Sequence, residues 1–124
     1  MFRFRKDGFK NLIVYERASE LRALVFKVTA NFPKIEIKRI GQMRNAARSI
    51  KQNIAEGYRR GTIPQFMNFL NISNGSVAEL DEDINDCYED GLIDKRVYGE
   101  LSSLSRKIKY LLEKLIKSLY KFKD

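Results

Sequence analysis

Apolar residues recur every three or four positions along almost the whole chain, and the pattern is interrupted only near Pro33, Gly61 and Gly91. This spacing places the apolar side chains on one side of a helix. Proline cannot continue a helix and glycine is common just past helix ends. The interruptions therefore divide the chain into four predicted helices, over residues 11–31, 35–59, 63–89 and 95–122. Strand-type alternation is nowhere sustained.

The last two predicted helices have the longest apolar seams. The seam of the third is Phe66, Leu70, Ser73, Val77, Leu80, Ile84 and Cys87. The seam of the fourth is Leu101, Leu104, Ile108, Leu111, Leu115 and Phe122. Thr62 and Asp94 precede these helices and are predicted N-caps. Long helices with short connections favour antiparallel neighbours, so we expect one domain over residues 1–124, an all-α, antiparallel up-down-up-down four-helix bundle.

The composition argues against several classes of protein. The 124 residues include no histidine, which removes the commonest general base and the commonest transition-metal ligand. We therefore expect no enzyme, no metal and no cofactor; an enzyme would need Glu56 with Asn53, or the acidic residues with a metal. Cys87 is the single cysteine and has no partner for an internal disulfide. No apolar run exceeds four residues and no secretory signal begins the chain, so a cytoplasmic protein without membrane spans is expected.

The net charge of +8 is unevenly distributed. Residues 1–60 contain 15 basic and 5 acidic side chains, residues 61–100 contain 2 and 9, and residues 101–124 contain 7 and 2, which gives +10, −7 and +5. Basic residues at helical spacing form two stripes, which predict contact with a phosphate backbone. The first stripe is Arg44, Arg48 and Lys51, extended by Arg59 and Arg60, and the second is Lys107, Lys114, Lys117 and Lys121. Solvated bundle faces, or an anionic membrane surface, are the alternatives.

Eight acidic residues lie between Glu79 and Asp94. They lack the loop pattern of a calcium site, and carboxylates along a straight helix do not surround an ion. A solvated face, or docking against the basic stripe of a neighbouring subunit, accounts for the run; a divalent cation or a basic partner is the alternative. Opposite charges on one domain favour head-to-tail self-association.

Small and polar residues interrupt the centre of the second and third predicted helices. Glycine within a helix costs about 1 kcal/mol relative to alanine, so Gly57 and Gly75 predict a close approach of the two helices. Asn53 and Glu56 share one flank, and we expect them to join a structural hydrogen-bond network with Arg44, Arg48, Ser73 or the start of the third helix. The polar motif is Asn53, Glu56, Gly57, Gly75 and Ser76.

The central segment resembles a known family. Its pattern is Asn-Ile-Ala-Glu-Gly at residues 53–57, a basic pair at 59–60, Phe-x-x-Phe-Leu at 66–70 and Gly-Ser-x-x-Glu-Leu at 75–80. In these motifs, and in the Phe-Lys-Asn-Leu segment at 9–12, the chain resembles the 23S rRNA intervening-sequence protein family. The resemblance covers roughly residues 9–93 and includes kinship with the accessory variability determinant of diversity-generating retroelements.

The resemblance implies a bundle that assembles into a homopentameric ring and has no catalytic residues. We therefore expect a non-enzymatic, basic oligomer that binds RNA or DNA through its backbone. The alternative is a protein-interaction scaffold, such as the accessory subunit of a reverse transcriptase. Tyr58 and Tyr110 could stack on bases or belong to an interface or its rim.

Overall fold

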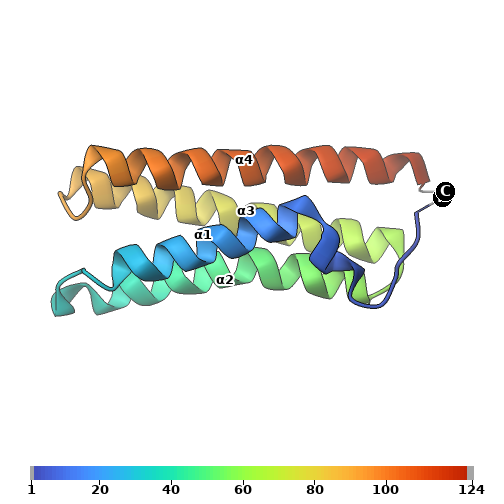
Figure 1. The fold of residues 1–124 in the computed structure, drawn as a ribbon, viewed down its shortest axis with the longest axis horizontal. Coiled ribbons are helices and arrows are strands. Elements are labelled where there is room, and N and C mark those ends of the chain that lie inside the picture. The colour runs from blue at the N-terminus through green and yellow to red at the C-terminus, as the bar shows by residue number, and fades with distance from the viewer. Residues whose placement is uncertain (1, 123–124) are drawn as a thin grey trace.

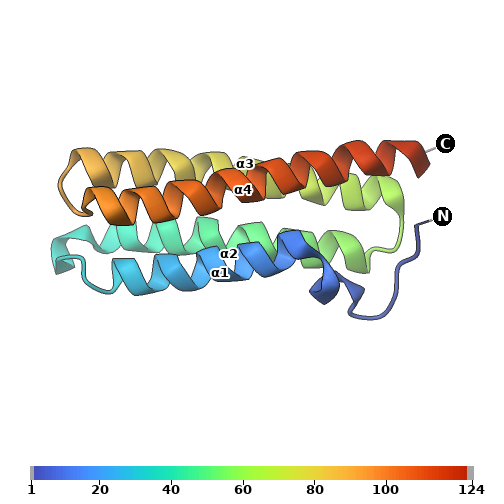
Figure 2. The same cartoon turned by 45° about the horizontal axis from the view of Figure 1, so that its top comes forward.

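Four long helices make up nearly all of the structure, a computed structural model that describes residues 2–122. They are α1 (Ile13–Thr29), α2 (Ile37–Arg59), α3 (Ile63–Glu89) and α4 (Lys95–Leu119), and residues 2–122 contain no strand. Successive helices run in opposite directions, and both ends of the chain lie at one end of the bundle (Figure 1, Figure 2). Each helix packs on the next and α4 packs on α1, so α2 and α4 occupy diagonal corners. None of the described helices is long and apolar enough to cross a bilayer.

Short 3₁₀ turns replace several predicted helix ends. They cover Gly8–Asn11, Lys34–Glu36 and Tyr120–Phe122. The prediction that the first helix begins at residue 11 is wrong, because Leu12 is extended, with φ −75° and ψ 128°. This break lets the preceding turn direct Phe9 into the core, where its side chain is 1% exposed. The second and fourth helices are likewise shorter than predicted, by two residues at the start of α2 and three at the end of α4.

Side-chain caps begin the third and fourth helices, as predicted. The Thr62 hydroxyl accepts a hydrogen bond from the Gln65 amide at 3.4 Å, and Pro64 lies in the first turn of α3. The Asp94 carboxylate accepts one from the Val97 amide at 2.8 Å. Each cap satisfies an amide that lacks a partner within the helix.

The core is built from one face of each helix. All seven predicted core residues of α3 are buried. The predicted seam of α4 is wrong in its second half, where Leu112 and Leu119 are buried instead, Leu111 and Leu115 are half-buried and Phe122 is 40% exposed. Leu111 and Leu115 line an open apolar groove against Leu12 and Ile13 at the start of α1. Leu111 and Leu115 thus pack at the edge of the core that faces the start of α1.

Aromatic rings close the end of the bundle where the termini lie. Phe2 and Phe4 pack against Phe66 and Tyr58, with ring centroids 5.2–6.2 Å apart. The Tyr58 hydroxyl accepts a hydrogen bond from the Arg5 amide at 2.9 Å and is 3.3 Å from the Arg3 carbonyl, to which it donates. Tyr58 is 6% exposed, so this ring stabilises the bundle end and has no free face for a base.

Candidate nucleic-acid interface

A row of cations follows the seam between α1 and α2 and lies over aromatic rings. At one end, the guanidinium carbons of Arg22 and Arg44 lie 4.5 and 4.6 Å from the centroid of the Phe26 ring. The Arg44 Nε also donates to the Thr29 hydroxyl at 2.9 Å, and Thr29 is buried. These distances are within the range of favourable cation–π contacts, and the hydrogen bond restricts the Arg44 side chain further. Arg44 is therefore part of the α1–α2 contact as well as of the surface.

The row continues toward the end of α2. The Lys51 ammonium lies 5.1 Å from the centroid of Tyr15, and the Arg59 guanidinium lies 4.5 Å from that of Phe9. Arg48 is exposed between them without a ring contact. From Arg44 to Arg59 the row is about 22 Å long at 1.5 Å per residue. We call it the α1–α2 stripe; it consists of Arg22, Arg44, Arg48, Lys51 and Arg59.

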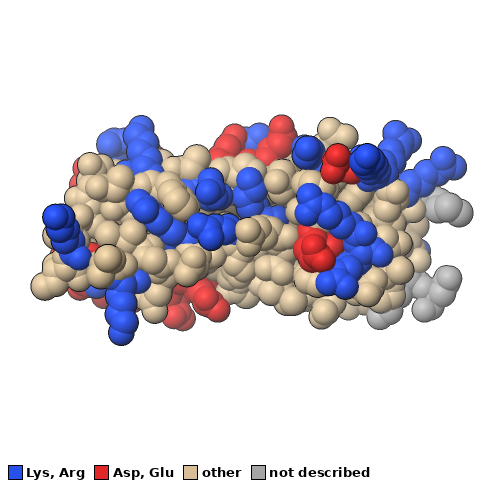
Figure 3. Space-filling view, turned by 90° about the horizontal axis from the view of Figure 1, so that it is seen from below, with Lys and Arg blue, Asp and Glu red and all other residues tan. Residues whose placement is uncertain are grey.

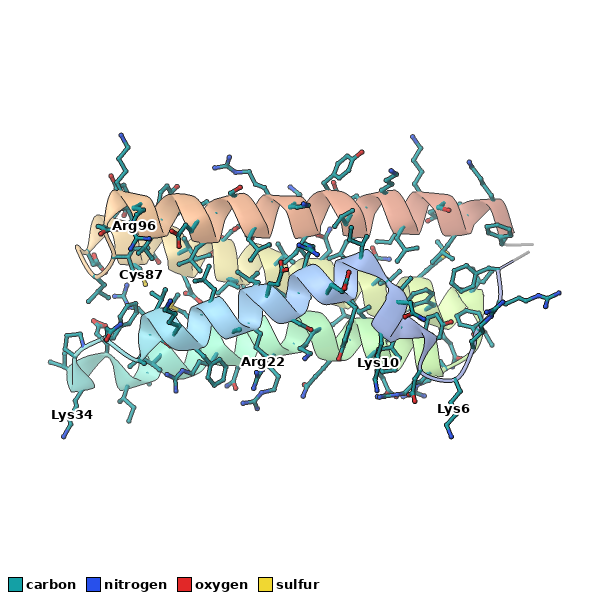
Figure 4. The ribbon with its side chains drawn as sticks, in the orientation of Figure 1. Lys6, Lys10, Arg22, Lys34, Cys87 and Arg96 are labelled. Carbon is teal, nitrogen blue, oxygen red and sulfur yellow. The ribbon has the colours of Figure 1, made fainter. Side chains whose placement is uncertain are left out.

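The charges of the α1–α2 stripe are not neutralised. Among the interactions within residues 2–122, no ion pair involves any of its five members. Other arginines are paired, among them Arg39 with Glu36 and Asp90, and Arg96 with Glu100 at 2.6 Å. Figure 3 shows blue side chains along the middle of this face, with few red ones between them. In Figure 4, Arg22 and Lys10 both lie on the lower side of the molecule, the side that α2 occupies.

Arg60 does not extend this stripe as predicted. Its guanidinium pairs with Glu56 at 2.9 Å and lies 5.2 Å from the ring of Phe69 in α3. Arg59 and Arg60 are adjacent in the sequence, yet their side chains contact opposite neighbours of α2. Consecutive residues point about 100° apart around a helix, so the adjacent side chains of Arg59 and Arg60 do not lie on the same narrow stripe.

A hollow opens in the stripe between Lys51 and Arg59. Tyr15, Gln52, Asn53 and Glu56 also line it. The two cations and the Gln52 amide offer donors to a phosphate oxygen, whereas the Asn53 amide donates to Ser49 and the Glu56 carboxylate is directed to Arg60.

Lysines of α4 and of the turn that follows it form a separate surface. Lys107, Lys114, Lys117 and Lys121 are all exposed. Because α2 and α4 are at diagonal corners, the structure does not bring these lysines to the α1–α2 stripe. Tyr110, which is 62% exposed, lies beside Lys114 with 5.9 Å between the ammonium and the ring centroid.

The predicted polar network exists, but with other partners. The Asn53 amide donates to the hydroxyl of Ser49 at 2.9 Å, and this hydroxyl lies 2.8 Å from that of Ser76 in α3. The Ser73 hydroxyl donates to the Ile50 carbonyl. Glu56 instead contacts Arg60, and the expected link of this network to Arg44 and Arg48 is wrong because these arginines face α1 or solvent. The network joins α2 to α3 and has a structural role.

The two glycines of the motif differ. A Cβ on Gly57 would lie 2.6 Å from the Phe69 Cβ and 3.2 Å from the Phe66 carbonyl, so Gly57 allows the predicted close approach of α2 and α3. Gly75 is exposed, and a Cβ there would have nothing within 4 Å. The prediction that Gly75 serves the same contact is therefore wrong.

Several acidic residues of α3 lie at its contact with α2. Glu79, Glu82 and Asp83 line a polar groove with Gln42 and Ser49. Desolvation, together with the nearby Asp86 carboxylate, raises the pKa of Asp83 above its ordinary value. Burial likewise raises the pKa of Cys87, which keeps this thiol protonated. Within residues 2–122 no group of acidic and cysteine side chains is arranged to hold a metal ion.

Reasoning from the sequence missed Arg22 and the three rings beneath the stripe. Tyr15, Arg22 and Phe26 are seven and four residues apart, a spacing that places them along one side of a helix. Phe9 belongs to the preceding turn, and its place under Arg59 depends on the break at Leu12. The helical spacing could have identified Tyr15, Arg22 and Phe26, whereas the position of Phe9 could be found only from the tertiary structure.

Comparisons with known proteins agree with this fold. A crystal structure of a protein of unknown function from the S23 ribosomal protein family of Bacteroides thetaiotaomicron is similar, with a TM-score of 0.78 and 23% sequence identity over 85% of this chain and 99% of that one. A comparison with curated proteins gives no significant match. Residues 10–114 match the family described as 23S rRNA-intervening sequence protein. Since this match covers most of the chain, the protein belongs to the 23S rRNA-intervening sequence protein family.

Proposed function

We propose that the protein is a non-enzymatic nucleic-acid-binding protein that contacts the backbone of RNA or DNA through the α1–α2 stripe. One observation carries the proposal: five cations lie in a row without an acidic partner in the described part of the chain. Cations that are not neutralised attract phosphates and release condensed counterions on binding.

The rings beneath the stripe favour this function. A long basic side chain loses rotamer freedom when it binds a phosphate, which lowers affinity. Contact with Phe26, Tyr15 and Phe9 restricts four of the five cations before binding. The ring contacts leave the charge intact, so the cations are prepositioned and still available to phosphate.

Self-association is part of the proposal. The family resemblance implies a pentameric ring, and a ring of five copies would carry a formal charge of about +40, five times the +8 of one chain. Several α1–α2 stripes on one particle would act together on a long polyanion. Light scattering of the purified protein tests the assembly, and a monomer would contradict it.

Fluorescence anisotropy with labelled RNA and DNA at two salt concentrations tests the binding. We expect affinity to fall steeply with salt, and Lys51→Gln to reduce the slope of log affinity against log salt by about 1. Lys117→Gln in α4 is the matched control, because it removes the same charge from the other basic surface. No binding at low salt by a folded protein would refute the proposed function.

A protein-interaction scaffold is the second candidate, and the groove between α1 and α4 favours it. Leu12, Leu111 and Leu115 line this groove, and Ile13 beside them is 52% exposed. An exposed apolar groove is typical of a protein contact. Capture of a specific protein, such as a reverse transcriptase, that survives nuclease treatment and is lost with Ile13→Asp would support the scaffold.

A further inference from the structure

We infer that the α1–α2 stripe selects the backbone of a double helix over a single strand. The inference rests on the proposed function and specifies its ligand class. Its basis is the occupancy of the aromatic rings: each ring along the stripe has a cation within 5.1 Å of its centroid, so a base that stacks there competes with that cation.

Proteins that bind single strands combine a basic groove with aromatic rings on which bases stack. Along the stripe, Phe26 has guanidinium groups at 4.5 and 4.6 Å, and Tyr15 has the Lys51 ammonium at 5.1 Å. Phe9 is 1% exposed and lies beneath Arg59. A base that displaced one of these cations from its ring would move the charge that attracts its own phosphate.

Without stacking, the density of phosphate charge decides which ligand binds better. A duplex has one charge per about 1.7 Å of its axis, twice the density of one of its strands. The stripe is about 22 Å long, which matches about six base pairs of a duplex at 3.4 Å each. The ring contacts hold four of the cations in place along the stripe, and a regular duplex backbone offers phosphates without having to be ordered first.

The α4 surface differs from the stripe because it presents an exposed aromatic ring. Tyr110 is 62% exposed beside Lys114, and the separation of 5.9 Å is longer than any of the cation–ring distances along the stripe. A base could stack on this ring. We therefore expect a single strand to bind at the α4 surface, so the test must separate binding at α4 from binding at the α1–α2 stripe.

The test measures affinities for a duplex of about 15 base pairs and for each of its separated strands, in RNA and in DNA, at one salt concentration. We expect both duplexes to bind at least about threefold more tightly than their strands, because stacking contributes nothing. Equal or tighter binding of the strands that persists in Tyr110→Ala would overturn the inference while leaving the proposed function intact. Loss of strand binding in Tyr110→Ala would then assign that binding to α4. No binding to any of the probes would refute the proposed function itself.

A second variant tests the role of the rings. Arg22→Ala uncovers part of Phe26 and removes one charge from the α1–α2 stripe. We expect duplex affinity to fall about threefold and strand affinity to fall less, so that the preference for the duplex decreases. Arg106→Ala is the matched control, since Arg106 is exposed on α4 and has no ring or ion-pair partner among the described interactions. Equal losses for duplex and strand in Arg22→Ala would contradict the inference.

Discussion

The two basic surfaces of this bundle have similar charge but different construction. In the α1–α2 stripe, four of five cations lie over rings and Arg44 also bonds a buried threonine. On the other surface, Lys107, Lys114 and Lys117 of α4 and Lys121 of the turn after it are exposed, and Lys114 lies beside the Tyr110 ring. Flexible lysines on a solvated helix face are common and keep a protein soluble. The comparison teaches that positioning, more than the number of charges, distinguishes a candidate binding surface from an ordinary charged face.

The largest expected effect comes from reversing charge on each surface. Arg48→Glu with Lys51→Glu should weaken nucleic-acid binding about 100-fold, because two attractive contacts become repulsive. Both positions are at least partly exposed, so the fold should be preserved. Lys114→Glu with Lys117→Glu makes the same change of charge on α4 and should weaken binding no more than about threefold. Anisotropy measures both, with circular dichroism as the check on folding; equal losses would remove the distinction between the surfaces.

A glycine-to-alanine substitution should also change the free energy of unfolding in opposite directions in α2 and in α4. Gly57→Ala in α2 places a Cβ against Phe69 and the Phe66 carbonyl, so we expect a loss of about 2 kcal/mol in the free energy of unfolding. Gly99→Ala in α4 meets no atom within 4 Å and should stabilise the protein by about 0.5–1 kcal/mol. Urea denaturation measures both. A neutral Gly57→Ala would mean that α2 can shift away from α3, and that the α1–α2 stripe lies on a less rigid support.

The sequence was sufficient for the four helices and for four of the five members of the α1–α2 stripe. Pro33, Gly61 and Gly91 separated the helices, and the spacing of three and four residues assigned the seam of α3 correctly. Arg44, Arg48 and Lys51 share a face because of helical geometry alone. Helix ends and helix faces depend on residues that are close together in the sequence, so the sequence alone predicts them.

Features that depend on the rotation of one helix against another were not predictable in this way. Leu112 replaces Leu111 in the core, Gly75 faces solvent, and Arg60 turns toward α3. Each error is a rotation of about one residue around a helix, or about 100°. The rings under the stripe come from α1 and the turn before it, so their contacts with α2 required the packed bundle.

A smaller effect tests whether the rings matter. Phe26→Leu keeps an apolar side chain but removes the surface on which Arg22 and Arg44 lie. We expect affinity for a duplex to fall about threefold, since each cation–π contact contributes roughly 0.5–1 kcal/mol at an exposed site. Tyr110→Leu on α4 is the control and should leave duplex affinity unchanged. An unchanged affinity in Phe26→Leu, in a variant that remains folded, would show that the charges alone suffice and that the two basic surfaces differ only in number and place.

The smallest expected effect separates both basic surfaces from the acidic groove between α2 and α3. The pKa of Asp83 is raised by desolvation and then by Asp86, while Arg39 opposes the shift. A carboxyl group with a raised pKa in the folded state is less favourable there when charged, so the fold loses stability as the pH rises above the ordinary value of 3.8 and the deficit persists at pH 7. Asp83→Asn removes this deficit and should raise the melting temperature by about 1–2 °C at pH 7, with no gain near pH 3, where the carboxyl is protonated in both states. Thermal melts at the two pH values measure the difference, and a gain of the same size at both would contradict the assignment to ionisation.

Duplex affinity should be unchanged in Asp83→Asn, because the acidic groove and the α1–α2 stripe lie on different sides of α2. A clear increase in affinity would mean that the acidic residues weaken the electrostatic potential at the stripe. The stripe and the α4 surface would then differ partly because of the charges that neighbour them.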